Sequence, residues 1–317
     1  MKTLTPQLIL INALLIQKTI KPTRLRSRYV TIFLVLAIFF SLTTLATAKI
    51  DDRTNDIILK INKAYGGENL NSAVAITLTD FNKTHLPGQS ESPNQPELWR
   101  FNEILTIDFK GERKSMLSWR VSRSATDLDK FVYDGNKGRI YDILNSKYSN
   151  EDWLTYNSVG SSVVRASDTM MARSLIPMPG NVGYEGDEPY RGENHHKLRV
   201  KINSNVEYTL FINQSTGLIA KMTRLHPRAG ELSYLFSNHH KKDGITFAKD
   251  MNFFVAGQLR ASSVKRDIKL NPNLDHMFES EPNFTPWGET FSQPERFVKK
   301  LSDNVFFINI FPSCLHH

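Results

Sequence analysis

Residues 99–110 read WRFNEILTIDFK, a stretch in which large apolar residues alternate with polar ones. The apolar positions are Trp99, Phe101, Leu105, Ile107 and Phe109. Because successive side chains of a strand point to opposite faces of its sheet, this alternation predicts a half-buried antiparallel strand. One face of the strand would enter a core and the other would meet solvent.

Similar short patterns lie on both sides of this stretch. Residues 131–144 predict a hairpin, because β-rich segments flank the turn sequence DGNKG at 134–138. About ten strands at a spacing of about ten residues predict a mainly β (α+β) fold, a single curved antiparallel sheet or half-barrel. The other predicted strands are residues 74–81, 117–121, 197–202, 207–212, 217–225, 231–237, 245–255, 259–270 and, near the end, 304–311.

Two helices are predicted among the strands. Residues 54–65 carry apolar side chains at helical spacing, and Gly66-Gly67 follow as a stop signal. Residues 163–175 repeat that spacing and end before Pro177, with Ser161 and Ser162 as the expected caps. A sheet of this length curls, and the two predicted helices are the elements that can pack against its concave face and fill it.

The first 48 residues predict an export signal. They contain six Lys and Arg but no Asp or Glu, and a basic cluster at 21–28 precedes the apolar run Tyr29-Leu45. Small residues at Ala46 and Ala48 fit the pattern that signal peptidase recognises, so we expect a soluble protein cleaved near Ala48. Without cleavage, the run would be a transmembrane helix that tethers the chain to the inner membrane. The lone Cys314 cannot form an internal disulfide, which suits a bacterial periplasm.

Most of the positive charge belongs to this leader. The whole chain has a formal net charge of +8, whereas 34 Lys and Arg face 32 Asp and Glu once the first 48 residues are removed. Arg100, Arg113, Lys114 and Arg120 interleave with aromatic residues, as in some nucleic-acid-binding faces. A nearly neutral exported domain nevertheless does not favour nucleic acid as a partner.

Five short segments follow one another in a characteristic order: IILKINKAYGG at 57–67, FVYDGNKG at 131–138, LFINQSTGL at 210–218, HKKDGITF at 240–247 and NPNLDHMF at 271–278. They resemble motifs of the periplasmic lipoprotein-carrier (LolA-like) fold. That resemblance implies a half-open β-barrel with helices over an apolar cavity, and it covers most of a predicted domain at residues 49–282. Asn213 stands where the family usually has Asp, and Ala248 stands where it usually has Pro.

Residues 297–310, FVKKLSDNVFFINI, resemble the opening strand of a metallo-β-lactamase-fold hydrolase. Some exported hydrolases carry a LolA-like domain just before that catalytic domain, whose His-x-His-x-Asp-His motif holds two zinc ions. This sequence lacks the motif, so zinc is expected only if the missing domain is present. Residues 283–317 are therefore predicted to be a linker and the truncated first strand of such a domain.

The sequence suggests no catalytic, cofactor-binding or metal-binding residues, so we expect that this chain is not an enzyme. The histidine pairs at 195–196, 239–240 and 316–317 are predicted to be solvated, because neighbours on a strand point to opposite faces. Asp127 and Asp129 are predicted in a solvated turn rather than as an acid/base pair. No nucleophile motif is present, and Cys314 lies in a predicted tail.

The predicted function rests on the large apolar residues. On a half-barrel with two helices, one face of the sheet would line an apolar cavity suited to a lipid or acyl ligand, although each residue alone fits an ordinary core. Two functions follow: an exported, non-catalytic carrier-like domain for an apolar ligand, or the accessory remnant of an exported zinc-dependent hydrolase. The predicted lining residues are Trp99, Phe101, Phe109, Trp119, Phe131, Met171, Tyr208, Phe236 and Phe253.

Overall fold

The computed structural model describes residues 51–86, 95–123, 125–287, 297–302 and 305–309. The chain comprises two compact units, residues 1–49 and 50–317, and all described residues belong to the second. The predicted leader, with the run Tyr29-Leu45 and the cleavage site near Ala48, lies outside the described residues. Within the described segments, no helix combines the length and apolar character needed to cross a membrane.

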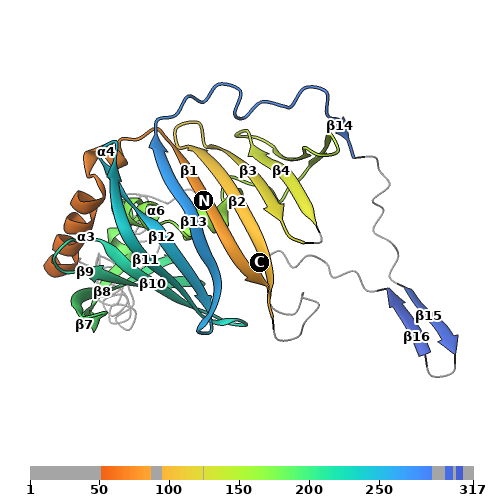
Figure 1. Ribbon diagram of the computed structural model, residues 1–317. Helices are drawn as coiled ribbons and strands as arrows, with labels where there is room; N and C mark the ends of the chain where they lie inside the picture. Colours follow the sequence, from red (N-terminus) through yellow and green to blue (C-terminus); the bar gives the residue numbers. More distant parts are fainter. Residues whose placement is uncertain (1–50, 87–94, 124, 288–296, 303–304, 310–317) are drawn as a thin grey trace, which may run out of the picture. The chain divides into compact units, whose positions relative to one another are not determined.

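Fourteen strands form one large, open, curved sheet (Figure 1). Their order is β14-β6-β5-β4-β3-β2-β1-β13-β12-β11-β10-β9-β8-β7, so the sheet consists of two antiparallel meanders joined where β1 pairs with β13. The first meander is β1 (Ala75–Leu86), β2 (Glu97–Asp108), β3 (Arg113–Val121), β4 (Thr126–Tyr133), β5 (Gly138–Asp142) and β6 (Lys147–Asn150). The second is β7 (Val182–Tyr190), β8 (Glu193–Asn203), β9 (Val206–Asn213), β10 (Ile219–His226), β11 (Gly230–Lys242), β12 (Ile245–Val255) and β13 (Gln258–Leu270).

The order of the strands explains where the central helices lie. β6 and β7 follow one another in the chain but lie near opposite edges of the sheet, so the connection must cross from one meander to the other. That connection contains α5 (Ser161–Arg165), α6 (Asp168–Leu175) and a 3₁₀ turn at Pro179–Asn181. Figure 1 shows α6 within the curve of β10, β11 and β12. The sheet face covered by this crossing is called the inner face.

The main core lies between the inner face and the helices. It contains inward-facing residues of both meanders, such as Ile76, Leu105 and Leu210, packed with Met171 and Leu175 of α6. The first helix, α3 (Asp52–Tyr65), adds a buried stripe to the same core and is followed by the short α4 (Glu68–Asn71). The mainly β, curved, antiparallel architecture predicted from the sequence is confirmed, and helices from two parts of the chain fill its inner face.

The sequence undercounts the strands. It predicts about ten, whereas the sheet has 14, and the missed strands include β6, β7 and the two-residue β14 (Thr285–Pro286). The β7 sequence, VGYEGDEPY, has two glycines, a proline and three acidic residues, which hide its strand character. As the last strand of an open sheet, β7 has a free edge where proline and charged side chains are tolerated.

The second predicted helix is two helices. The predicted segment 163–175 breaks at Ala166 and Ser167, because the Ser167 side chain accepts a hydrogen bond from the Met170 backbone at 3.2 Å and caps α6. The expected caps Ser161 and Ser162 are instead the first two residues of α5, whose N-cap is Gly160. The break lets the chain turn as it crosses the inner face.

The segment after β13 is packed through Trp287, whereas the sequence predicted a linker from residue 283. Phe278 is buried with Val132 and Tyr141 on the outer face of the first meander, and Phe284 packs edge-on against Tyr141 at 5.5 Å. β14 then pairs in parallel with β6. Farther on, Phe297–Ser302 and Val305–Asn309 pair as β15 and β16, a separate two-stranded antiparallel sheet.

Gly66 is the glycine on which the end of α3 depends. It has a φ of 121°, and a Cβ placed there would lie 2.7 Å from the Gly244 carbonyl oxygen in the turn between β11 and β12. We predict that Gly66→Ala lowers the free energy of unfolding by about 2–4 kcal/mol, measured by urea denaturation of the full chain. Gly192→Ala is the matched control: its φ is 81° but nothing lies within 4 Å, so about 1 kcal/mol is expected. Equal costs would contradict the packing role.

Candidate functional site

The buried carboxylate of Asp168, at the start of α6, joins the helices to the sheet. Its Oδ2 atom accepts hydrogen bonds from the Tyr65 hydroxyl and the Ala248 backbone N–H, each at 3.0 Å, and lies 3.4 Å from His239 Nε2. The Tyr65 hydroxyl in turn accepts a hydrogen bond from the Ile219 N–H at 3.1 Å. Helix α3, helix α6 and strands β10, β11 and β12 therefore meet at one carboxylate.

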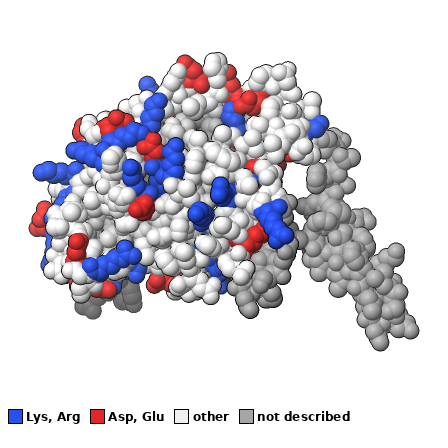
Figure 2. Space-filling view, in the orientation of Figure 1, with Lys and Arg blue, Asp and Glu red and all other residues white. Residues whose placement is uncertain are grey.

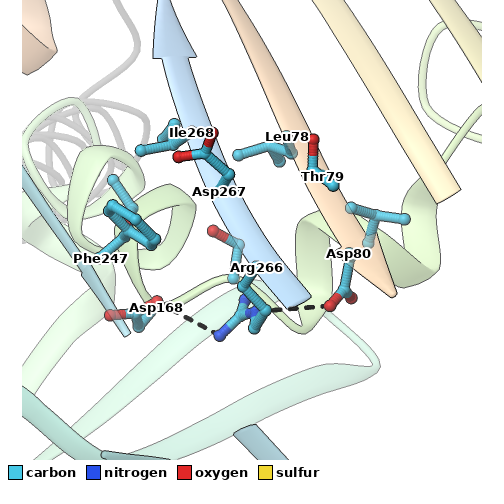
Figure 3. A pocket seen from close by; sticks show the side chains of 11 residues that line it. Leu78, Thr79, Asp80, Asp168, Phe247, Arg266, Asp267 and Ile268 are labelled. Carbon is cyan, nitrogen blue, oxygen red and sulfur yellow. Dashed lines mark ion pairs between the residues drawn. The ribbon is translucent and has the colours of Figure 1, made fainter. Parts of the chain in front are cut away.

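Arg266 extends this network toward β1. Its guanidinium lies between Asp80 and Asp168, 3.4 Å and 3.9 Å away, and donates to the carbonyl oxygens of Ala166 and Ala248 at 2.8 Å and 3.1 Å (Figure 3). Burial alone would raise the pKa of Asp168, but the hydrogen bond with His239, the charge of Arg266 and the Tyr65 hydroxyl hold it below its ordinary value.

The space around this network is too small for a ligand. Its cavity has a volume of about 10 Å³, which is near the minimum for a single water. Within it, Arg266 of β13 lies between Asp168, at the start of α6, and Asp80 of β1 (Figure 3). We therefore assign the Arg266–Asp168 contacts a structural role and look for a binding site elsewhere on the inner face.

A cavity lies between the crossing helices and strands β8 and β9. Its volume is about 490 Å³, within the range of small-molecule sites. Three methionines line it, Met170, Met171 and Met178, and their flexible side chains can adapt to different shapes. We call it the methionine cavity. Its other lining residues are Lys114, Asn157, Ser161, Val164, Arg165, Ser174, Ile202, Asn203, Val206 and Tyr208.

Two polar groups in the methionine cavity are unusual. Lys114 is only 6% exposed, its ammonium lies 4.4 Å from the centre of the Tyr156 ring, and burial lowers its pKa to about 8. The Tyr208 hydroxyl is buried without a hydrogen-bond partner. Both groups belong to a mainly apolar wall, where each could orient the polar end of a ligand.

A second cavity, of about 270 Å³, lies on the other side of α5. We call it the polar cavity. One wall carries Asp80 and Asn82 of β1 with Glu103 of β2, and the opposite side carries Arg165 and Arg224. Burial, and then the nearby charge of Asp80, raise the pKa of Glu103 to about 7. The remaining lining residues are Ser162, Ala166, Leu232, Tyr234, Met251, Phe253 and Ala261.

The sequence-predicted lining residues divide into three groups. Met171 and Tyr208 lie along the methionine cavity, and Phe253 lies along the polar cavity, stacked on Tyr234 at 4.7 Å. Another five pack within or against the inner face of the sheet but line neither cavity: Trp99, Phe101, Phe109, Phe131 and Phe236.

Trp119 is on the wrong face for the predicted lining. The β2–β3 register pairs Trp119 with Asn102, whereas Arg120 pairs with the inward-facing Phe101. Trp119 therefore points to the outer face, where its ring packs edge-on against Phe81 at 4.9 Å. The reason is the turn before β3, which fixes the register and places the apolar alternation of residues 117–121 outward.

Sequence reasoning missed the polar side of the site. Asp80, Asn82 and Glu103 occupy inward-facing strand positions, where the alternation favours apolar residues. The signal was present, because charged residues at core positions mark either paired charges or a binding site. Arg165 and Arg224 carried no comparable signal, since arginine is ordinary on helix and strand surfaces.

The histidine and carboxylate predictions need correction. His195 is 2% exposed and hydrogen-bonds to the Glu193 carbonyl, and His239 contacts Asp168, so neither is the solvated side chain predicted. Asp127 and Asp129 lie on β4 rather than in a turn, and both pair with Arg120. Among the described residues, no three His, Cys, Asp or Glu side chains gather as metal ligands.

Two of the arginines that imitate a nucleic-acid face, Arg113 and Arg120, have local partners. Arg113 pairs with Asp108 at 2.6 Å, and Arg120 lies within 3.4 Å of two aspartates. On the face that Figure 2 shows, acidic residues lie among the Lys and Arg and wide uncharged areas separate them. That face therefore offers no continuous basic surface for a phosphate backbone.

No protein-family model matches the sequence, and no curated protein matches it either. Solved structures are similar in fold. A LolA superfamily protein, NE2245 from Nitrosomonas europaea, is 13% identical with a TM-score of 0.44, covering 72% of this chain and 97% of that one. A DUF1329 family protein from Desulfovibrio piger is 13% identical with a TM-score of 0.40, covering 73% and 98%.

A third similar structure is a putative outer membrane lipoprotein-sorting protein domain from Vibrio parahaemolyticus. It is 9% identical with a TM-score of 0.39, and the match covers 70% of this chain and 95% of that one. With TM-scores below 0.5, these likenesses carry no argument about ligands, and that argument rests on the two cavities.

The Tyr65 hydroxyl gives a direct test of the Asp168 network. Tyr65→Phe leaves the ring in place but removes a donor to Asp168 and an acceptor for the Ile219 N–H. We expect a loss of about 2–3 kcal/mol in the free energy of unfolding, because two buried groups lose a partner. Tyr133→Phe is the control, since that hydroxyl contacts only the Gly135 carbonyl at an exposed turn, and it should change stability little. Similar losses for both variants would argue against the network.

Glu103 should make stability fall as pH rises. Its pKa is raised from 4.5 to about 7, so between these values the folded chain holds a proton that the unfolded chain has released. Stability therefore decreases from pH 5 to pH 8, by at most about 3 kcal/mol. Glu103→Gln should remove this decrease in urea titrations, whereas Glu207→Gln, at an exposed position, should keep it. Parallel pH profiles for wild type and Glu103→Gln would contradict the assignment.

Proposed function

We propose that this protein is an exported, non-catalytic carrier-like domain that binds a lipid or acyl ligand in the methionine cavity. The observation that carries the proposal is the 490 Å³ space left between the crossing helices and the sheet. A well-packed core has few voids larger than a water, so a space of this size with flexible methionine walls favours binding over a purely structural interior.

The energetics favour an unbranched hydrocarbon chain. Each methylene group moved from water into such a cavity contributes about 0.8 kcal/mol, so one chain segment can supply micromolar affinity without many polar contacts. Lys114, Ser174 and Tyr208 supply a few polar groups in an otherwise apolar wall. They would orient a carboxylate or ester at one end of the chain.

The LolA-like motifs and the leader support the same proposal from the sequence side. A basic cluster, an apolar run and small residues before Ala48 would send the domain out of the cytoplasm, to a bacterial periplasm. A carrier there would shield a hydrocarbon chain from water during transfer. The alternative of an accessory domain from a zinc-dependent hydrolase stays a prediction that rests on residues 297–310 alone.

Filling the methionine cavity tests the proposal. The full chain, freed of lipid by an organic-phase resin, is titrated with the fluorescent fatty acid cis-parinaric acid. Val206→Trp places a large ring into the cavity and should weaken uptake at least tenfold, or about 1.4 kcal/mol. Val264→Trp is the matched control, because Val264 is 59% exposed on β13, and its uptake should equal that of the wild type.

Circular dichroism of both variants confirms that each is folded before uptake is compared. Mass spectrometry of an organic extract then shows whether the untreated chain carries lipid from the cell. A wild-type chain that is empty and takes up no parinaric acid, or a folded Val206→Trp variant that binds as well as Val264→Trp, would overturn the proposal.

A further inference from the structure

Helix α5 is the partition between the methionine cavity and the polar cavity. Ser161 and Val164 line the methionine cavity, Ser162 lines the polar cavity, and Arg165 lines both. Helix α5 has only five residues, so one guanidinium at its end can reach the two spaces. A ligand chain in the methionine cavity would therefore end next to a second, more polar space.

One wall of the polar cavity is rich in acceptors. Asn82 is 7% exposed, and its Oδ1 atom is buried with no hydrogen-bond partner. Asp80 is 3% exposed, and its Oδ1 atom lies 3.4 Å from Arg266 Nε in an ion pair. Glu103, directly opposite Asp80 in the β1–β2 register, has no ion pair within the described segments.

The other side offers donors without acceptors. The Nε atom of Arg224 is buried with no hydrogen-bond partner, and the guanidinium lies 5.8 Å from the centre of the Tyr208 ring. Neither Arg224 nor Arg165 pairs with a carboxylate in the part of the chain that the structure describes. Two arginines on one side of a cavity are a common arrangement for phosphate, because the planar guanidinium binds its oxygens in pairs.

Burial leaves some of these groups without the hydrogen bonds that water gives them in the unfolded chain. An unpaired acceptor, Asn82 Oδ1, and an unpaired donor, Arg224 Nε, line the same cavity. They do not satisfy one another across it. A single ligand group with positive N–H donors at one end and an anion at the other would satisfy both walls together.

We propose that the polar cavity binds the headgroup of an amphiphile whose hydrocarbon chain occupies the methionine cavity, and that this headgroup is a phosphoethanolamine, with its ammonium toward Asp80, Asn82 and Glu103 and its phosphate toward Arg165 and Arg224. The inference rests on the proposed function for the position of the chain. The 270 Å³ of the polar cavity suits a headgroup rather than a second long chain.

The acceptors in the polar cavity favour a headgroup with a primary ammonium over one with a quaternary amine. The Oδ1 atom of Asn82 needs an N–H donor, which an ammonium has and a trimethylammonium lacks. Glu103, whose pKa is raised to about 7, would ionise more readily beside a bound cation. A headgroup with phosphate but no amine would leave the whole acceptor wall unsatisfied.

The test compares headgroups on identical chains. The lipid-free full chain is loaded with cis-parinaric acid, which is then displaced by dioctanoyl phosphatidylethanolamine, phosphatidylcholine or phosphatidylglycerol. We expect phosphatidylethanolamine to displace the probe at a concentration at least tenfold below that of either other lipid. Equal displacement by all three lipids overturns the headgroup inference and leaves the proposed function intact. Failure of the wild type to bind parinaric acid and all three lipids overturns both.

Two variants locate the preference in the polar cavity. Asn82→Leu and Glu103→Gln should each reduce the preference for phosphatidylethanolamine to less than threefold while parinaric acid binding is unchanged. Arg224→Gln should weaken all three phospholipids by a similar factor, while Arg199→Gln, whose side chain is 55% exposed, should not. A full preference that persists in folded Asn82→Leu and Glu103→Gln overturns the assignment to this cavity. Circular dichroism and urea midpoints show that each variant is folded.

Discussion

Asp168 is the residue that joins the helices of this protein to its sheet. A carboxylate with almost no exposure survives in the core only because hydroxyl, amide, imidazole and guanidinium groups from four other elements point at it. Its place at the first residue of α6 adds the favourable field of a helix N-terminus. Because Arg266 also binds the carbonyl of Ala166, the position of the break between α5 and α6 depends on the same network.

That anchor explains why empty space can persist beside it. The crossing helices are held at Asp168 by directional hydrogen bonds, so they need not settle against every part of a curved sheet that is wider than they are. The space splits on either side of α5 into an apolar part rich in methionine and a part with unpaired polar groups. The proposed binding function depends on this combination of a rigid anchor and adaptable walls.

Much of the fold was accessible from the alternation of residues 99–110 and its repeats, because a half-buried strand imposes a period of two on its own sequence. The first helix was equally clear, since Gly66 marks its end. The candidate site was harder to predict from the sequence. Trp119 shows why: the pattern shows that it alternates, but only the register with β2 shows that it faces outward. Asp80 and Glu103 were passed over because a strand pattern treats inward charges as exceptions.

What the sequence by itself determined is local and periodic: a mainly β chain, an amphipathic first helix, turns at glycines, and a net positive charge concentrated in the first 48 residues. The tertiary structure alone decided that β1 and β13 join two meanders, that the crossing chain runs over the inner face, and that Arg165 stands between two cavities. The physical reason is that cavities and ion networks arise from residues far apart in sequence. No local preference of any single segment encodes the distance between them.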